Sequence, residues 1–248
     1  MTPDALLRFE AARNKIVGTD REKKGIGTLG EKTLHAVLKH YFEPDSSFHE
    51  IRCGTFFADI FNAEGITEIQ TRSFNTLRRK LDFFLPLGAV RIVYPIAAVK
   101  YLRWIDPETG VISPPRKSPK RSTACECFYE LYKIKSYLKH PNLRLCIVLL
   151  ETEELRLKNG WSADGKKGSS RFERIPLQLI DELNIAHPAD YARLLPDSLP
   201  ARFTASDLRK HANLSVSKAQ TAANVLHSVG ALSLCGKVGR AFLYERTT

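Results

Sequence analysis

Residues 57–72 read FADIFNAEGITEIQTR, two apolar runs joined by turn-forming residues. The first run carries Asp59, the second carries Glu68, and residues 62–65 have the composition of a tight turn. The β-branched and aromatic residues predict two paired strands, which would bring Asp59 and Glu68 together. Burying a carboxylate without a partner is costly, so the pair predicts a site for a hard divalent cation such as Mg²⁺ or Mn²⁺. The alternative is a carboxylate pair at the surface of a hairpin.

The segments around this hairpin alternate between helical and strand periodicity. The predicted elements are a helix over 29–41, strands over 48–53, 55–61 and 66–71, a helix over 75–85, a strand over 89–99, a hairpin from 101–105 to 111–112, a helix over 124–138, a strand over 143–150 that continues towards Leu157, and a short helix over 177–183. Helix, three strands, helix and strand in this order predict an α/β domain with a mixed sheet flanked by helices.

The composition narrows the class of partner. The chain has 248 residues, 43% hydrophobic content and a formal charge of +11, so we expect a globular protein that attracts polyanions. Nucleic acid is the first partner to consider, with DNA favoured over RNA, and an acidic membrane surface is the second. No apolar run reaches the roughly 20 residues of a spanning helix, and the partner we expect is DNA and not a membrane. A signal peptide pattern is absent and the five cysteines form no disulfide framework, which predicts a cytoplasmic protein with reduced thiols. Whether it forms a homodimer is left open.

A proline-rich basic segment spans residues 113–122, with the sequence SPPRKSPKRS. Its prolines exclude the interior of a helix or a strand, so we expect a loop. The loop contains four cations and no acid, a composition that can follow a phosphate backbone; a solvated basic loop is the alternative. The cations are Arg116, Lys117, Lys120 and Arg121.

The prolines at 188, 196 and 200 predict a boundary between an α/β domain over 1–185 and a second domain over 186–248. In the second domain, Thr204 and Asp207 have capping-box spacing for a helix that ends near His211. A longer helix starts near Ser215 or Ser217 and ends before Gly230. Two short apolar runs then flank the basic, glycine-containing tip 235–240, which predicts a hairpin.

This order of elements resembles a winged helix-turn-helix domain, with 189–195 as its first helix. The resemblance implies that the helix near Ser217 enters the major groove of DNA and that the hairpin contacts phosphate. The corresponding helix residues are Ser217, Lys218, Gln220, Thr221 and Asn224, and the hairpin residues are Lys237 and Arg240. A module for dimerisation or domain packing is the alternative.

Gly30-Glu31, Asp59 and the run Glu68 to Arg72 resemble the restriction-endonuclease-like, or PD-(D/E)XK, nuclease superfamily, particularly its Holliday-junction-resolvase-like branch. The resemblance covers residues 28–99. It implies a metal-dependent phosphodiesterase in which Glu31, Asp59 and Glu68 hold magnesium or manganese, with Gln70 as the fourth site residue. Glu31 and His35, one helical turn apart, could instead be an ordinary exposed pair.

Gln70 stands where that superfamily usually has a lysine, and a neutral amide can orient water but carries no charge. A cation could come instead from Arg72, which we also expect to contact DNA, or from the run Arg78, Arg79 and Lys80, whose alternative role is a solvated helix face. The sequence therefore predicts a metal-dependent DNA endonuclease with a winged-helix module. There are two alternatives. The protein could be a catalytically inactive nuclease fold that acts as a DNA-binding or regulatory protein, or it could be a protein-interaction adaptor.

Overall fold

The computed structural model of the protein describes residues 2–23, 33–160 and 168–247. The chain divides into two compact units, each made of three segments. The first unit comprises residues 1–47, 97–121 and 149–181, and the second comprises residues 48–96, 122–148 and 182–248. The predicted boundary at 185/186 lies inside the second unit, which contains both the 57–72 hairpin and the C-terminal elements.

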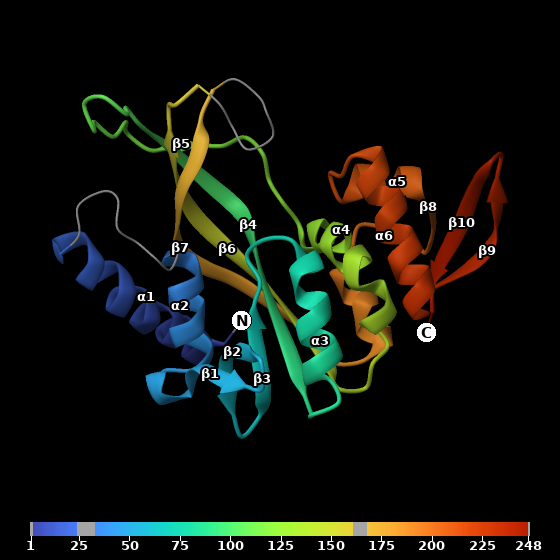
Figure 1. Cartoon of the computed structure of the whole chain (residues 1–248). Coiled ribbons are helices and arrows are strands. Elements are labelled where there is room, and N and C mark those ends of the chain that lie inside the picture. The colour runs from blue at the N-terminus through green and yellow to red at the C-terminus, as the bar shows by residue number, and fades with distance from the viewer. Residues whose placement is uncertain (1, 24–32, 161–167, 248) are drawn as a thin grey trace. The chain divides into compact units, whose positions relative to one another are not determined.

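Within the described residues, seven strands form one sheet flanked by helices, which confirms the predicted α/β class with a mixed sheet (Figure 1). The order across the sheet is β1 (His49–Cys53), β2 (Phe56–Asn62), β3 (Gly65–Ile69), β4 (Val90–Ile105), β6 (Leu143–Leu157) and β7 (Ser170–Ile185), with β5 (Arg116–Lys117) paired to β4. Strands β1, β2 and β3 pair antiparallel, whereas β3 and β4 run parallel. A parallel pair needs a crossover connection, and the helical segment after β3 supplies it.

That crossover consists of η2 (Phe74–Leu77) and α3 (Arg78–Phe84), close to the predicted helix over 75–85. Leu77, Leu81 and Phe84 are buried at helical spacing, so α3 turns one apolar face to the core of the second unit. The predicted helix over 124–138 is a series of helical turns: η3 (Ala124–Cys127), α4 (Phe128–Leu131) and η4 (Tyr132–Tyr137). Ile134 has non-helical dihedral angles, which interrupts the series.

In the first unit, α1 (Pro3–Lys23) packs against α2 (Thr33–Phe42). The rings of Phe9 and Tyr41 meet edge to face with centroids 5.6 Å apart. Helix α2 agrees with the prediction where the structure describes it. Helix α1 was not predicted, although its buried residues Ala5, Phe9 and Ala12 have helical spacing. A short turn, η1 (Ser46–Phe48), leads to β1.

The predicted helix over 177–183 is wrong, because this segment belongs to the long strand β7. Ile175 and Leu179 are buried and Leu177 is half-buried, so the apolar residues follow the period of two of a strand. The predicted hairpin around 101–112 also differs. Strand β4 continues to Ile105, where the returning chain keeps one bridge to Ile112, and the basic segment then pairs with β4 as β5.

The last part of the second unit contains η5 (Pro188–Leu194), β8 (Arg202–Thr204), α5 (Ala205–His211), α6 (Val216–Val229), β9 (Leu232–Val238) and β10 (Ala241–Arg246). The three strands form a separate sheet in the order β8, β10, β9. Thr204 and Asp207 make the predicted capping box of α5, and Ser215 caps α6. Gly230 ends α6 with a φ of 86°, a conformation that glycine adopts without strain.

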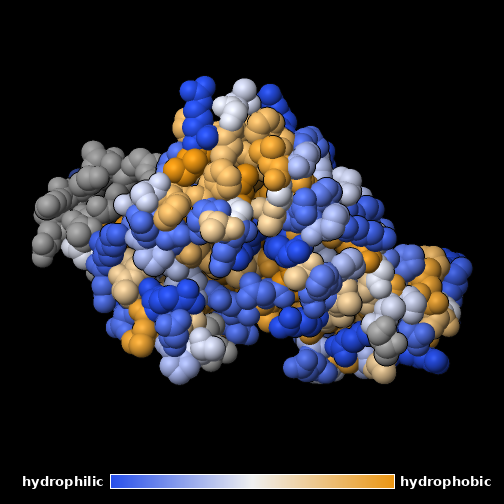
Figure 2. All heavy atoms as spheres, turned by 90° about the horizontal axis from the view of Figure 1, so that it is seen from below, coloured by the Kyte–Doolittle hydropathy of each residue, from blue (hydrophilic) through white to orange (hydrophobic). Residues whose placement is uncertain are grey.

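Hydrophilic residues cover much of the face shown in Figure 2, with smaller hydrophobic areas between them. All five cysteines are free, as predicted, and four of them are buried. Among the helices that the structure describes, none combines the length and apolarity needed to cross a membrane.

Candidate active site

Strands β2 and β3 place Asp59 and Glu68 opposite each other. Ile60 pairs with Thr67, and the next position along this register sets Asp59 beside Glu68 on one face of the sheet. Gly65 has a φ of 109°, and a side chain there would meet the carbonyl oxygen of Ala89 at 2.4 Å, so the turn requires glycine. The backbone N–H of Ile69 donates a hydrogen bond of 2.6 Å to Oδ2 of Asp59. The predicted meeting of the two carboxylates is confirmed.

Glu68 is buried, with 4% of its side chain exposed, and it is ion-paired. Nζ of Lys80, on α3, donates to both carboxylate oxygens of Glu68, at 3.0 Å to Oε1 and 2.8 Å to Oε2. The same ammonium group donates to the carbonyl oxygen of Phe57 at 2.7 Å. A buried charge requires such partners, and Lys80 therefore ties α3 to both strands of the hairpin.

Burial is the main reason why the pKa of Glu68 rises from its ordinary value of 4.5 to about 7, and the negative charge of Asp59 raises it further. The ammonium group of Lys80 acts in the opposite direction. Because the charge of Asp59 raises the pKa of Glu68, the two carboxylates lie close enough to act on one cation. The arrangement therefore attracts positive charge beyond the single ammonium group of Lys80.

Gln70 lies at the end of β3, but its amide is used by the following turn. Its Nε2 donates to the carbonyl oxygen of Ser73 at 3.2 Å and to Oγ1 of Thr76 at 2.9 Å. Its Oε1 accepts from the backbone N–H of Arg72 at 3.4 Å. Gln70 thus fixes the start of the crossover that carries Lys80, and the positive charge next to Glu68 comes from Lys80.

Lys80 was one of four cations that the sequence left open for this role. Arg72, Arg78 and Arg79 are exposed, whereas Lys80 is half-buried. The helix period of the sequence could have singled out Lys80 among these cations. Lys80 lies three residues after Leu77 and four before Phe84, which places it on the apolar face of α3. The alternative that Lys80 belongs to a solvated helix face is therefore wrong.

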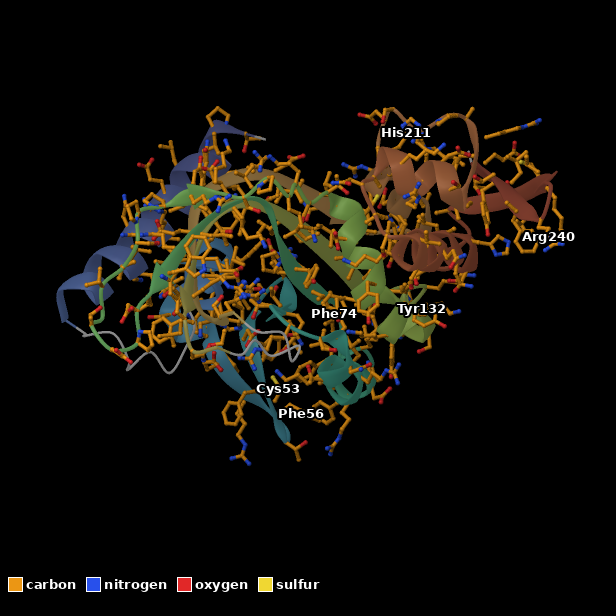
Figure 3. The ribbon with its side chains drawn as sticks, turned by 90° about the horizontal axis from the view of Figure 1, so that it is seen from above. Cys53, Phe56, Phe74, Tyr132, His211 and Arg240 are labelled. Atoms are coloured by element: carbon orange, nitrogen blue, oxygen red, sulfur yellow. The ribbon has the colours of Figure 1, made fainter. Side chains whose placement is uncertain are left out.

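Glu31 lies outside the described residues, so its predicted part in the site stays a prediction, as does its pairing with His35. Across the described ranges, no group of three His, Cys, Asp or Glu side chains is arranged to hold a metal ion. Cys53, at the end of β1 (Figure 3), is close enough to Glu68 for the negative charge to raise the thiol pKa, although burial is the larger cause.

In the first unit, the four cations of the basic segment are exposed. Arg116 and Lys117 form β5 opposite Leu102 and Tyr101 of β4, and Nζ of Lys117 lies 5.7 Å from the centre of the Tyr101 ring. Arg121 donates to the carbonyl oxygen of Ser118 at 2.7 Å. The predicted loop is therefore wrong at residues 116–117, which contain no proline and pair with the edge of β4.

On α6, the residues expected to face DNA do not share one environment. Ser217, Gln220 and Asn224 are exposed, and Thr221 is half-buried. Lys218 instead forms an ion pair with Glu126 of η3. Nζ of Lys135 on η4 donates to Oδ1 of Asn224 at 3.2 Å. One side of α6 is thus fixed to η3 and η4, while its polar face remains exposed.

At the C-terminal hairpin, Lys237 and Arg240 are exposed. Figure 3 shows Arg240 near the tip of this hairpin. Nζ of Lys237 lies 5.2 Å from the centre of the Phe242 ring. Phe242, Leu234 and Val238 are also exposed, at 50%, 46% and 59%. The hairpin therefore offers cations and apolar side chains together.

By its fold and site, the protein is an α/β protein in which Lys80 of the crossover helix is ion-paired with the buried Glu68, on the strand next to the half-buried Asp59. Residues 32–186 match the family model "Domain of unknown function (DUF8091)", and because this is more than half of the chain, the protein belongs to that family. An uncharacterized protein of Treponema pallidum (strain Nichols) is 30% identical over 190 residues, which cover 74% of this chain and 73% of the relative. A search of solved structures gives no significant match.

Proposed function

We propose that the protein is a metal-dependent DNA endonuclease whose active site contains Asp59, Glu68 and Lys80. The observation that carries this proposal is the convergence of two carboxylates and one ammonium group from β2, β3 and α3. The resemblance to the PD-(D/E)XK superfamily expects two acids and a lysine in this part of the fold. The antiparallel strands β1 to β3, followed by a helix and a parallel β4, support the same resemblance.

The residues present fit a divalent metal ion. Asp59 and Glu68 offer hard oxygen ligands from adjacent strands. Burial and, to a smaller extent, the charge of Asp59 raise the pKa of Glu68, and a bound cation would favour its charged form. Glu31 could add a third oxygen by resemblance. The metal would supply charge neutralisation at the phosphate and a lower pKa for an attacking water.

Lys80 would perform the role of the lysine that the superfamily usually has at the position of Gln70. Its ammonium group is held by Glu68 and by the carbonyl oxygen of Phe57, so it has a fixed place beside the carboxylates. A fixed positive charge can stabilise the negative charge that develops on phosphate oxygens. Gln70 would act indirectly, by holding the turn before α3.

The C-terminal elements would hold the DNA. Their order and the three-stranded sheet support the resemblance to a winged helix. Ser217 and Gln220 would face DNA from α6, and Lys237 and Arg240 would contact phosphate from the hairpin. Asn224 is exposed as well, but its Oδ1 already accepts a hydrogen bond from Lys135. Lys218 would contribute through its contact with Glu126 rather than by touching DNA.

The test is cleavage of duplex, branched and single-stranded DNA by the full chain with Mg²⁺ or Mn²⁺. We expect cleavage that Asp59→Asn and Lys80→Met each reduce by at least about a hundredfold. Asp59→Asn removes a charged oxygen ligand for the metal, and Lys80→Met removes a positive charge that stabilises the transition state. Arg79→Met is the matched control, because Arg79 is an exposed cation next to Lys80. Absence of cleavage on all three substrates would refute the proposal.

A second candidate function, binding without cleavage, is favoured by one observation. Both carboxylate oxygens of Glu68 already accept hydrogen bonds from Lys80, so a metal ion would have to share Glu68 with that ammonium group. This candidate predicts salt-sensitive DNA binding that neither EDTA nor Asp59→Asn changes. Isothermal titration with Mn²⁺ separates the two functions, because only the nuclease needs a metal-binding signal that Asp59→Asn removes.

A further inference from the structure

Two tyrosines on the α4–η4 segment are unusually exposed. Tyr129 is 50% and Tyr132 is 51% exposed, and they lie three residues apart, so their rings project from neighbouring positions of one helical surface. Figure 3 shows Tyr132 at the outer side of this segment. Exposed aromatic rings that fill no core are available to a partner.

Each of these rings has a lysine beside it. Nζ of Lys133 lies 4.9 Å from the centre of the Tyr129 ring, and Nζ of Lys135 lies 5.3 Å from the centre of the Tyr132 ring. Glu130, between them in sequence, has only 12% of its side chain exposed and accepts hydrogen bonds from Lys133 and from the backbone N–H of Phe74. Glu130 points inwards and pairs with Lys133, which has only 20% of its side chain exposed. The exposed acid nearby, Asp82, accepts a hydrogen bond from Tyr137. The two rings, Lys135 and Arg78 are therefore the aromatic and cationic groups that this surface offers.

This surface is fixed to the crossover that carries Lys80. Lys133 donates to Oγ of Ser73 at 3.0 Å, and Nε of Arg78 donates to the carbonyl oxygen of Lys133 at 2.7 Å. The hydroxyl of Tyr137 donates to Oδ1 of Asp82 at 2.7 Å. Because Ser73, Arg78 and Asp82 belong to the η2–α3 segment and its N-cap, a strand bound on the tyrosines would be held at a defined place relative to Lys80.

The other end of the surface meets α6. Lys135 donates to Asn224, and Lys218 pairs with Glu126, so α6 is fixed to the same helical series. The tyrosines therefore lie on a segment that contacts both α3 and the helix expected to face DNA.

We propose that the surface of Tyr129, Tyr132, Lys135 and Arg78 binds unpaired bases of single-stranded DNA, with Lys133 holding the Tyr129 ring in place. This rests on the proposed function, since it defines the substrate as DNA with a single-stranded segment next to the cleavage site. Unpaired bases can stack on tyrosine rings, which bases inside a duplex cannot do, and lysine and arginine complement the phosphates between them. Two rings together with two cations match the aromatic and basic character of single-strand binding surfaces.

The experiment measures binding of the full chain to fluorescein-labelled (dT)20 and to a blunt duplex of equal length, in EDTA and low salt, by fluorescence anisotropy. We expect Tyr129→Ala and Tyr132→Ala each to weaken (dT)20 binding about tenfold and to leave duplex binding within about twofold, as loss of one stacked base predicts. Tyr132→Phe keeps the ring and should bind as the wild type does. Phe48→Ala, which removes another exposed aromatic ring, should also have no effect.

Equal (dT)20 affinity for the wild type and both alanine variants would overturn the proposal, and so would a wild type that does not bind (dT)20. An equal loss for (dT)20 and duplex would also overturn it, because stacking acts on unpaired bases. EDTA keeps this test independent of cleavage: tyrosine-dependent binding without nuclease activity would refute the proposed endonuclease but not this surface. Circular dichroism of Tyr132→Ala against Tyr132→Phe shows whether the alanine variant is folded.

Discussion

The hairpin β2–β3 and the hairpin β9–β10 both carry charged side chains, but they expose them differently. Glu68 on β3 is buried and has its charge compensated by Lys80, whereas Lys237 and Arg240 near the tip of the other hairpin are exposed. A buried charge constrains its neighbours, because its burial must be compensated by a partner at a fixed place. Exposed charges impose no such constraint, so they are free to serve a ligand. The following substitutions test this difference.

Lys80→Met should have the largest effect on stability. It leaves the buried carboxylate of Glu68 without its ammonium partner, and loss of one member of a buried pair costs about 3 kcal/mol. We expect the free energy of unfolding, measured by urea denaturation at pH 8, to fall by about that amount. Arg79→Met, the matched surface control, should change it by less than about 0.5 kcal/mol.

The pH dependence tests the cause of this loss. The folded-state pKa of Glu68 is raised from 4.5 to about 7, so its protonated form favours the folded state, and this contribution to stability is fully present below pH 4.5 and lost as pH rises to about 7. The cost of Lys80→Met should therefore be smaller at pH 5, where Glu68 is protonated, than at pH 8. A cost independent of pH would show that Lys80 stabilises through packing alone. Glu68→Gln combined with Lys80→Met should recover part of the stability at pH 8.

Lys218→Met should have an intermediate effect. Its ion pair with Glu126 is partly buried, with 32% and 17% of the two side chains exposed, and it joins α6 to η3. We expect a loss of about 1 kcal/mol in the free energy of unfolding. Glu126→Gln should cost a similar amount, and the double variant should cost less than the sum of the two. Additive losses would mean that the two side chains do not stabilise each other.

The sequence predicted the parts of the fold that depend on local period and turn chemistry. Asp59 and Glu68 could be placed opposite each other because a glycine turn fixes the register of two short apolar runs. The caps of α5 and α6 were predictable for the same reason, since Thr204, Asp207 and Gly230 act on their own helix.

Other features required knowledge of contacts distant in sequence. The segment 177–183 fits both a helical and a strand period, and the strand β7 pairs with β6, which the local sequence does not reveal. Lys218 and Glu126 are 92 positions apart, so nothing near Lys218 indicated that its charge was already paired. Lys80 was one of the cations that the sequence offered for the site. Its partial burial depends on which face of α3 packs against the strands, and the charge of the residue does not indicate this.

Substitutions at the C-terminal hairpin should have the smallest effect on stability. Lys237→Met and Arg240→Met remove exposed cations, so each should change the free energy of unfolding by less than about 0.5 kcal/mol. If these cations contact phosphate, each substitution should weaken duplex binding and reduce the slope of log K against log salt by about 1, because one fewer counterion is released. Fluorescence anisotropy over a salt series measures both. Lys218→Met should leave the salt slope unchanged, because the charge of Lys218 is paired with Glu126 in the free protein. A change in slope as large as that of Lys237→Met would mean that Lys218 contacts DNA. The distinction between a cation that holds the fold and one that is available to a ligand would then be lost.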